Sequence, residues 1–434
     1  MTGKNVYDIL DERGFVHQST DPDVLRERLA AGPTVFYAGF DPTASSLHVG
    51  HLLPVMAMRW LARCGHRPIA LVGGGTGMIG DPSGKTEARR LLEGREVAEN
   101  AAALGLQLRR VIGSDSLIAV DNADWLAPLK YLDFLRDYGR LFSVNRMLAM
   151  ESVRQRLETG MTFLEFNYML LQAYDYLVLS RDYGCDLQLG GSDQWGNIVA
   201  GVDLVRRVGR REVHALTLPL LLKSDGEKFG KSSGGAVWLN PELTSPFEYY
   251  QFWRNAEDAE VGRLLALFTE LPMAEVKRLG GLAPPEVNRG KEILGFEATR
   301  LVHGEDEAAR AWLAAGREFG FADPDGLIDT SSGITEVSGT DTEAELPTIH
   351  LSKKQMEQRP ELKKLLAILV VLSSELKLGG SRGEARRLIR GGGCYIDDDR
   401  VSDENAEVPD EKIEAGEFIL RAGKKKRVRV VVTA

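Results

Sequence analysis

Cysteine is scarce in this sequence of 434 residues. The three cysteines, Cys64, Cys185 and Cys394, are odd in number, lie far apart and form no Cys-x-x-Cys pair. This pattern argues against a disulfide framework and against a cysteine zinc site, and it is typical of proteins in a reducing compartment. We therefore expect a cytoplasmic protein.

Long apolar runs are missing as well. The longest run near the C-terminus, residues 365–372, is far too short to span a bilayer. The first 20 residues are polar and mixed in charge, which is not the pattern of a signal peptide. We expect no membrane partner, and the sequence shows no fixed-period repeat.

An excess of positive charge is also absent. Lys and Arg number 54 against 63 Asp and Glu, a formal net charge of −9, which excludes a polycation that coats nucleic acid along its whole length. The charge is uneven, because residues 361–434 hold 15 basic and 13 acidic side chains and the first 360 residues carry −11. An acidic body and a mildly basic end indicate separate tasks for separate parts.

The organisation of the chain is that of a parallel α/β sheet followed by helices. The 43% of hydrophobic residues suffice for a sizeable core. Residues from about 245 to 320 have a mostly helical pattern, and a polar stretch rich in Ser, Thr, Gly, Asp and Pro precedes a compact C-terminal module. Strands are predicted over 35–40, 67–73, 186–191 and 216–222, and helices over 50–64 and 87–105.

A first chemical cluster lies where the first of these strands ends. The run from Tyr37 to Thr43 is followed by His48-Val49-Gly50-His51 at the start of a helix. Ligands of open α/β sheets bind at the carboxyl ends of strands, and a helix N-terminus favours phosphate groups. Taken alone, the two histidines are also compatible with a simple helix cap.

A second cluster is Lys228-Phe229-Gly230-Lys231-Ser232, after another predicted strand. Two lysines three residues apart on a glycine-containing loop suit a mobile clamp on a polyphosphate. Taken alone, this segment is also compatible with a solvated surface loop.

Together the two clusters resemble the signatures of class I aminoacyl-tRNA synthetases, His-x-Gly-His and Lys-x-x-Lys-Ser. The surrounding residues resemble bacterial tyrosyl-tRNA synthetases, and the resemblance covers essentially the whole chain. The runs that carry it are Y-A-G-F-D-P-T-A-S-S-L-H-V-G-H, G-D-P-S-G-K, N-Y-M-L-L-Q-A-Y-D, L-Q-L-G-G-S-D-Q-W-G-N and K-F-G-K-S.

Two other glycine patterns imitate nucleotide-binding motifs, but the residues around them do not match those motifs. Residues 75–80 satisfy G-x-G-x-x-G, but the acidic residue that a dinucleotide site needs about 20 positions later falls in a helix-like stretch near Glu96. Gly84-Lys85-Thr86 imitates the end of a phosphate loop, but Ile79 stands where that loop requires glycine.

The resemblance implies an α/β fold with several domains. It assigns a Rossmann-like parallel-sheet catalytic domain to 1–240, with a dimer-forming insertion at about 125–160, and an α-helical tRNA-recognition domain to 241–325. A linker over 326–350 and a small α+β RNA-binding domain over 351–434 complete the chain. The family is homodimeric, so we expect a homodimer.

The resemblance also implies the activity, tyrosine–tRNA ligation. L-Tyrosine and ATP would form tyrosyl-adenylate and pyrophosphate, and tyrosine would then pass to the 3'-terminal ribose of tRNA(Tyr). In the family, Tyr37 and Asp175 match the positions that bind the substrate hydroxyl, and Tyr168, Gln172 and Asp175 share one helical face. Further residues that match positions around the amino acid are Asp81, Asn122, Gln188 and Gln194.

The first step requires no general base, because the substrate carboxylate is already ionised at neutral pH. Catalysis would come from positioning and from charge stabilisation. Magnesium is expected to accompany ATP, with no protein ligands assigned. The residues expected to act in catalysis are Thr43, His48, His51, Lys85, Arg89, Lys228 and Lys231. The residues expected to bind ATP are Gly39, Asp41, His48, Gly50, Gly191, Asp193, Lys231 and Ser232.

The C-terminal module carries the candidate RNA contacts. A capping box opens a helix at Ser381, and the segment S-R-G-E-A-R-R-L-I-R-G-G-G resembles a small RNA-binding domain of this family and of a ribosomal protein. The chain departs from that pattern at 394–398, where three consecutive aspartates begin at Asp397. The basic helix is also compatible with a merely solvated surface. The residues expected to bind RNA are Arg382, Arg386, Arg387 and Arg390.

Two other functions are compatible with parts of the sequence. One is a non-catalytic RNA-binding protein on a synthetase scaffold, against which the two intact signatures argue. The other is a tryptophan-specific relative, whose pocket would not need the pair Tyr37 and Asp175.

Overall fold

The structure is a computed structural model. It describes residues 4–81, 83, 94–158, 160–222, 229–232, 235–337, 348–353, 364, 386–387, 389–397, 399–403, 405–422 and 426–433. The chain divides into two compact units, Met1–Ala309 with Ala322–Glu336, and Arg310–Phe321 with Val337–Ala434. Within the described ranges, no helix has the length and apolar character needed to cross a membrane.

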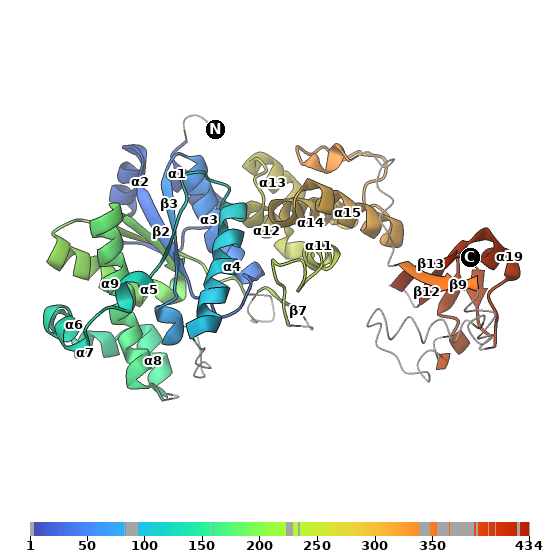
Figure 1. The fold of residues 1–434 in the computed structure, drawn as a ribbon. Coiled ribbons are helices and arrows are strands. Elements are labelled where there is room, and N and C mark those ends of the chain that lie inside the picture. The colour runs from blue at the N-terminus through green and yellow to red at the C-terminus, as the bar shows by residue number, and fades with distance from the viewer. Residues whose placement is uncertain are drawn as a thin grey trace. The chain divides into compact units, whose positions relative to one another are not determined.

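A six-stranded sheet with the order β1-β6-β5-β2-β3-β4 forms the centre of the first unit (Figure 1). Five of its strands run parallel, and β1 pairs antiparallel with β6. The chain continues from β2 to β3 and β4 on one side and later to β5 and β6 on the other, so the strand order reverses between β2 and β5. Open α/β sheets bind ligands at such a reversal. The strands are β1 (Gln18–Ser19), β2 (Val35–Phe40), β3 (Arg67–Val72), β4 (Ile118–Asp121), β5 (Leu187–Gly191) and β6 (His214–Leu218).

The parallel α/β fold predicted from the sequence is confirmed, including a strand over 35–40. The sequence analysis missed β4, because its apolar run, residues 117–120, is only four residues long and the strand itself is exposed or half-buried. The predicted strand over 216–222 lies partly on β6, which begins and ends earlier.

Helices cover both faces of the sheet. On one face, α9 and α10 pack in a core that includes Tyr37, Ile69 and Leu71, every second residue of their strands. Helices α3 and α4 pack against the sheet from the other side. The helices of this part are α1 (Val6–Arg13), α2 (Pro22–Ala30), α3 (Leu52–Arg63), α4 (Gly94–Ile112), α5 (Ala123–Leu126), α6 (Tyr131–Asp137), α7 (Val144–Leu148), α8 (Glu151–Glu158), α9 (Phe163–Tyr183) and α10 (Trp195–Leu204).

Helix α9 has a clear start signal at its N-terminus and a clear stop signal at its C-terminus. Thr162 and Glu165 form a capping box at its start, and Gly184 at its end adopts a left-handed conformation with φ 67°. These local signals fix the residues at which α9 begins and ends.

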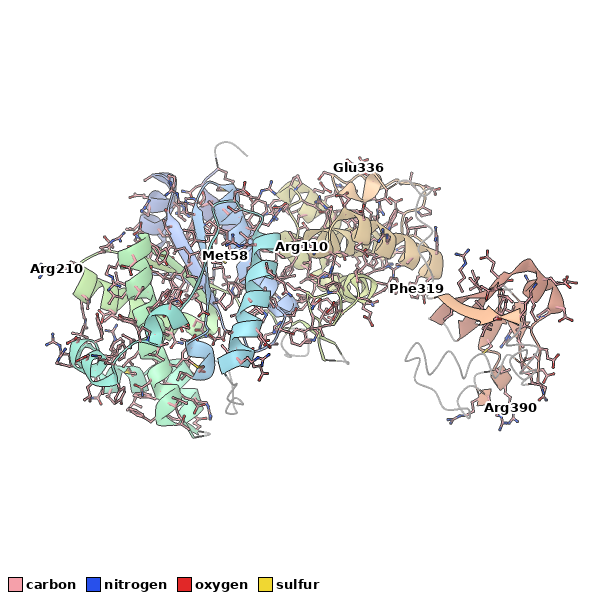
Figure 2. All side chains as sticks on the ribbon, in the orientation of Figure 1. Met58, Arg110, Arg210, Phe319, Glu336 and Arg390 are labelled. Atoms are coloured by element: carbon pink, nitrogen blue, oxygen red, sulfur yellow. The ribbon has the colours of Figure 1, made fainter. Side chains whose placement is uncertain are left out.

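A group of helices follows the sheet in the chain, and two of them pack on the helices that cover the sheet. Helix α12 contacts α1 and α3, and α14 contacts α4. Arg110 of α4, labelled in Figure 2, donates from Nη2 to the carbonyl of His303 at 2.8 Å. The mostly helical pattern predicted for this part of the chain is therefore present. These helices are α11 (Pro246–Arg254), α12 (Val261–Phe268), α13 (Met273–Gly280), α14 (Val287–His303) and α15 (Glu305–Phe319).

Part of the predicted linker is ordered on these helices. Glu275 of α13 accepts from Thr330 Oγ1 at 2.6 Å, and Glu297 of α14 accepts from Ser332 Oγ at 2.5 Å. Residues 326–336 therefore pack on the first unit, and their small polar side chains are hydrogen-bonded to its carboxylates. Composition alone predicted an unattached segment here, because it does not show which acceptors a Ser or Thr will meet.

The second unit contains a five-stranded sheet with the order β11-β10-β12-β13-β9. Asp397 occupies the turn between β10 and β11 with φ 52°, and its Oδ1 accepts from Ile419 N at 2.8 Å. The first of the three aspartates thus closes a hairpin, a task for which Asp is well suited. The elements are β9 (Thr348–Ser352), β10 (Cys394–Ile396), β11 (Asp399–Val401), α19 (Asp410–Ala415), β12 (Glu417–Ala422) and β13 (Lys426–Thr433).

Candidate active site

Buried polar side chains of β2, β5 and α9 mark a candidate pocket on one face of the sheet. Tyr37 of β2 and Gln188 of β5 are register partners, so their side chains point to the same face. Tyr37 Oη, Gln172 Oε1 and Gln188 Oε1 are buried, and none of the three has a hydrogen-bond partner among the described residues. Because buried polar atoms are almost always paired, unpaired oxygens on β2, β5 and α9 indicate a site for a polar ligand.

Asp175 of α9 lies in the same pocket and is 2% exposed. Its Oδ2 accepts from Asn122 Nδ2 at 2.9 Å and its Oδ1 from Trp125 Nε1 at 2.7 Å. Burial raises the pKa of Asp175 to about 7, although the two hydrogen bonds oppose that shift. Burial and the nearby Asp175 carboxylate also raise the pKa of Tyr37, so its phenol is neutral at physiological pH.

A chain of hydrogen bonds joins this pocket to the carboxyl end of β2. Asn122 Nδ2 also donates to Thr76 Oγ1 at 3.0 Å, and Thr76 Oγ1 donates to Asp41 Oδ1 at 2.9 Å. Asp41 Oδ2 accepts from Tyr168 Oη at 3.0 Å. Residues predicted to bind tyrosine and residues predicted to bind ATP therefore belong to one hydrogen-bond network.

Further polar contacts of the site lie at the carboxyl end of β5. Gln194, in the short helix η4 (Ser192–Gln194), donates from Nε2 to Asp81 Oδ2 at 2.7 Å. Asp81 Oδ1 accepts from Ser83 N at 2.9 Å. The bond between Gln194 and Asp81 joins the chain after β3 to the chain after β5. It therefore spans β2, which lies between these two strands in the sheet.

The predicted nucleotide side offers open backbone beside β2. At Gly39 an added Cβ would meet no atom within 4 Å, so a flat ligand can approach the strand there. Thr43 is exposed, and its N–H donates to Asp41 O at 2.8 Å. Gly191 and Asp193 lie at and after the end of β5, across the strand-order reversal from β2.

The two histidine side chains accept backbone hydrogen bonds at the start of the short helix η1 (Val49–His51). His51 Nδ1 accepts from His48 N at 3.1 Å, and His48 Nδ1 accepts from Gly50 N at 3.0 Å. Capping, one alternative left open by the sequence, is therefore present. It also fixes the tautomer, because a neutral ring that accepts at Nδ1 carries its hydrogen on Nε2. A capping role and a donor role are thus compatible.

The two signature segments, 180 residues apart in the sequence, meet at two glycines. Gly230 has φ 94°, and an added Cβ would lie 2.8 Å from Gly50 N, so only glycine fits. Gly230 O accepts from Val237 N at 3.0 Å, and Val49 N donates to Val237 O at 2.9 Å. The expectation that both clusters belong to one site agrees with this contact.

Several predicted residues lie outside the described part of the chain: Lys85, Arg89, Lys228 and Arg382, together with the side chains of Lys231 and Ser232. Among the residues that the structure describes, no group of three or more His, Cys, Asp or Glu side chains could hold a metal ion.

Residues 29–319 match the family described as tRNA synthetases class I (W and Y), and residues 342–430 match the tyrosine–tRNA ligase SYY-like C-terminal domain. The tyrosine–tRNA ligase of Desulfosudis oleivorans is 49% identical over 99% of each chain. That of Clostridium tetani is 46% identical over 99% of this chain and 100% of its own length. This chain belongs to the class I tyrosyl-tRNA synthetase family.

A solved structure of the same family supports the fold. The C-terminally truncated mitochondrial tyrosyl-tRNA synthetase of Aspergillus nidulans has a TM-score of 0.67 and 31% identity, covering 73% of this chain and 95% of that one. The ligase class that the two signatures indicated is confirmed, and neither a non-catalytic RNA-binding protein nor a tryptophan-specific relative is favoured.

Two polar partners of this synthetase site were missed from the sequence. Trp125 binds Asp175 directly, and Thr76 bridges Asn122 to Asp41. Trp125 lies three residues after Asn122, which was identified, and this short spacing was the signal available. Thr76 stands inside the glycine run that was considered only as a nucleotide fingerprint.

Three of the four candidate RNA-binding arginines lie at described helical positions of the second unit. Arg386, Arg387 and Arg390 (the last labelled in Figure 2) are exposed, whereas Ile389 between them is fully buried. The segment therefore turns its apolar side inward and presents three cations to solvent.

Proposed function

We propose that this chain ligates L-tyrosine to tRNA(Tyr) in two steps, through tyrosyl-adenylate. The observation that carries the choice of amino acid is the pair Tyr37 and Asp175, which are both buried and interact electrostatically. A phenol both donates and accepts a hydrogen bond, and this pair offers one donor and one acceptor. Phenylalanine would leave both groups unpaired in a buried site, which is costly.

The ammonium group of the substrate is assigned to a second group of oxygens. Tyr168 Oη, Gln172 Oε1 and Asp81 are the proposed partners, and Gln172 Oε1 is one of the three buried oxygens without a partner among the described residues. Gln188 and Gln194 would lie beside the amino acid. A cation prefers such oxygen ligands, since each can accept a hydrogen bond from it.

ATP is assigned to the carboxyl ends of β2 and β5. Gly39 and Gly50 would allow the base and ribose close to the backbone, Asp193 would bind the ribose, and Asp41, Gly191 and Ser232 would complete the site. Magnesium would arrive with the nucleotide, and no step is assigned to it because the described residues include no cluster that fits it.

In the adenylation step, the tyrosine carboxylate attacks the α-phosphorus of ATP and pyrophosphate leaves. The proposed protein contribution is charge stabilisation on the transferring group and on the leaving pyrophosphate. Donors from three segments would converge there, of which the Nε2–H tautomer of His48 fits this role. The proposed donors are Thr43, His48, His51, Lys85, Arg89, Lys228 and Lys231.

Transfer RNA is assigned to the helical region and to the second unit. Arg386, Arg387 and Arg390 are exposed on one segment, and the family resemblance adds Arg382, which lies outside the described residues, to the proposed set. Arginine and lysine contacts to phosphate supply most non-specific RNA affinity, so this contribution should weaken as salt rises.

A homodimer is proposed through the insertion at about 125–160. Tyr131, Leu132, Val144, Leu148 and Leu157 are large apolar residues exposed in this short stretch, and Leu132 is 77% exposed. A concentration of this kind marks an interaction surface. Sedimentation of the chain and of a Leu132→Asp variant tests it, because the variant should shift toward monomer.

The decisive experiment is ATP–pyrophosphate exchange measured with each amino acid separately, followed by charging of tRNA(Tyr). Exchange with tyrosine alone, together with charging, is the expected result. Exchange with tryptophan would indicate a tryptophan-specific relative. RNA binding without exchange would indicate a non-catalytic RNA-binding protein.

A further inference from the structure

The loop 41–48, between β2 and η1, has no regular secondary structure to fix it apart from one isolated β-bridge at His48. It carries Thr43 and His48, two of the proposed donors. Its position is nevertheless defined, because two amide side chains of α4 hold it at its beginning and at its end. These are Asn100 and Gln107.

At the beginning of the loop, Asn100 Nδ2 donates to Pro42 O at 3.1 Å. Asn100 is 7% exposed, and Pro42 directly precedes Thr43. The bond fixes the carbonyl of the peptide group that joins Pro42 to Thr43.

At the end of the loop, Gln107 Oε1 accepts from Leu47 N at 2.9 Å, and Gln107 Nε2 donates to Ser46 Oγ at 3.2 Å. Ser46 Oγ donates its hydrogen to Leu47 O at 2.7 Å and accepts a further bond from Asn240 N at 3.1 Å. The buried hydroxyl thus uses its donor and both acceptor positions. Gln107 is therefore bound to the two residues that precede His48.

The same contacts extend to the strand-like segment that follows the second signature. Leu239 N donates to Leu47 O at 2.8 Å, and His48 forms an antiparallel bridge with Trp238. Ser46 Oγ links Gln107 to Asn240, because it accepts a hydrogen bond from each of them. A single side chain on α4 is thus linked to the loop that leads into the first signature and to the segment that follows the second.

Asn100 and Gln107 are seven residues apart, which is two helical turns, so both side chains leave α4 on the same face. This spacing matches the two ends of the loop. We propose that Asn100 and Gln107 are positioning residues that hold loop 41–48 so that Thr43 and His48 meet the reacting phosphate. The proposal rests on the function proposed above, because it needs Thr43 and His48 to act on ATP.

The experiment compares the Gln107→Leu, Gln107→Glu and Asn100→Asp variants of the full chain. Gln107→Leu removes both bonds to the loop. Gln107→Glu keeps an acceptor for Leu47 N and loses the donor to Ser46 Oγ. Asn100→Asp loses the donor to Pro42 O. The matched control is Leu106→Ala, one residue from Gln107 on the exposed side of α4.

The measured quantities are the single-turnover rate of adenylate formation at saturating substrates, the tyrosine dissociation constant and the melting temperature. A displacement of about 1 Å at a reacting group can lower a rate by on the order of 100-fold. We expect Gln107→Leu to lower the adenylation rate at least ~10-fold. Gln107→Glu and Asn100→Asp should fall between it and the wild type. Tyrosine affinity should change less than ~2-fold in all variants, because no bond of Asn100 or Gln107 reaches the tyrosine pocket.

An adenylation rate in Gln107→Leu equal to that of Leu106→Ala would overturn the proposal. So would a parallel loss of rate, tyrosine affinity and melting temperature, which a purely structural role predicts. If the wild-type chain itself gave no tyrosine-dependent exchange, the proposed function would fail instead, and the two failures are thereby distinguished.

Discussion

Trp125 Nε1 donates a 2.7 Å hydrogen bond to Oδ1 of Asp175. Together with Asn122 it gives each carboxylate oxygen one donor in a buried pocket, yet burial still holds the pKa of Asp175 at about 7. The carboxylate is therefore near the boundary between its two protonation states at physiological pH. Substrate recognition and stability should both depend on this balance.

The stability of the folded chain should carry a pH dependence from Asp175. Its pKa is 3.8 when unperturbed and about 7 in the folded chain, so folding takes up a proton between these values. The stabilising contribution is complete below about pH 4 and is lost as the pH rises through about 7. Asp175→Asn removes this contribution, whose slope is at most about 1.4 kcal/mol per pH unit. Urea unfolding of both proteins from pH 5 to 8 measures it, and equal slopes would contradict the expectation.

Tyr37→Phe should separate stability from recognition. Tyr37 Oη has no hydrogen-bond partner among the described residues, so its removal should leave the free energy of unfolding unchanged or higher. Tyrosine binding should weaken by roughly 0.5–1.5 kcal/mol, the value of a neutral hydrogen bond. The preference for tyrosine over phenylalanine in pyrophosphate exchange should fall. An unchanged preference would show that Tyr37 does not bind the substrate hydroxyl.

Lys231→Ala should act on the transition state and not on the bound amino acid. Stopped-flow measurement is expected to show a large loss of adenylation rate with little change in the tyrosine dissociation constant. Ser232→Ala, at the next position of the same signature, serves as a comparison without loss of charge. Equal losses of rate and tyrosine affinity in Lys231→Ala would count against a clamp.

Removal of the chain after residue 350 should abolish tRNA charging and spare adenylate formation. The cut must lie beyond 336, because residues 322–336 are hydrogen-bonded to α13 and α14 and their loss would damage the first unit. Pyrophosphate exchange and charging are measured on the same preparation. Intact charging by the shortened chain would show that the residues after 350 are not needed for tRNA binding.

Asp397→Ala should destabilise the hairpin of the second unit by about 1–2 kcal/mol, through a lost hydrogen bond and a left-handed residue without compensation. Asp397→Asn should be much milder, because asparagine tolerates the same conformation and keeps an oxygen for Ile419 N. Hydrogen exchange of β10 and β12 reports the difference. Similar protection in both variants would mean that the turn does not depend on this side chain.

Much of the fold and part of the site could be predicted because the relevant signals are local. The strand 35–40 is a continuous apolar run ended by Asp41-Pro42, so its place in the sheet follows from neighbouring residues. Tyr168, Gln172 and Asp175 share a helical face by spacing alone. In contrast, the apolar run of β4 is only four residues long, and the polar stretch 326–336 did not show that Glu275 and Glu297 would bind it.

The sequence by itself determined the family, the two signatures and the residue types around the substrate, because these depend on the order and spacing of residues in the chain. Tertiary structure decided which atoms meet: Gly50 with Gly230, Trp125 with Asp175, and α4 with loop 41–48. These contacts join residues that lie about 50 to 180 positions apart, and no local pattern encodes their distances. The raised pKa of Asp175 likewise follows from burial, which exists only in the folded chain.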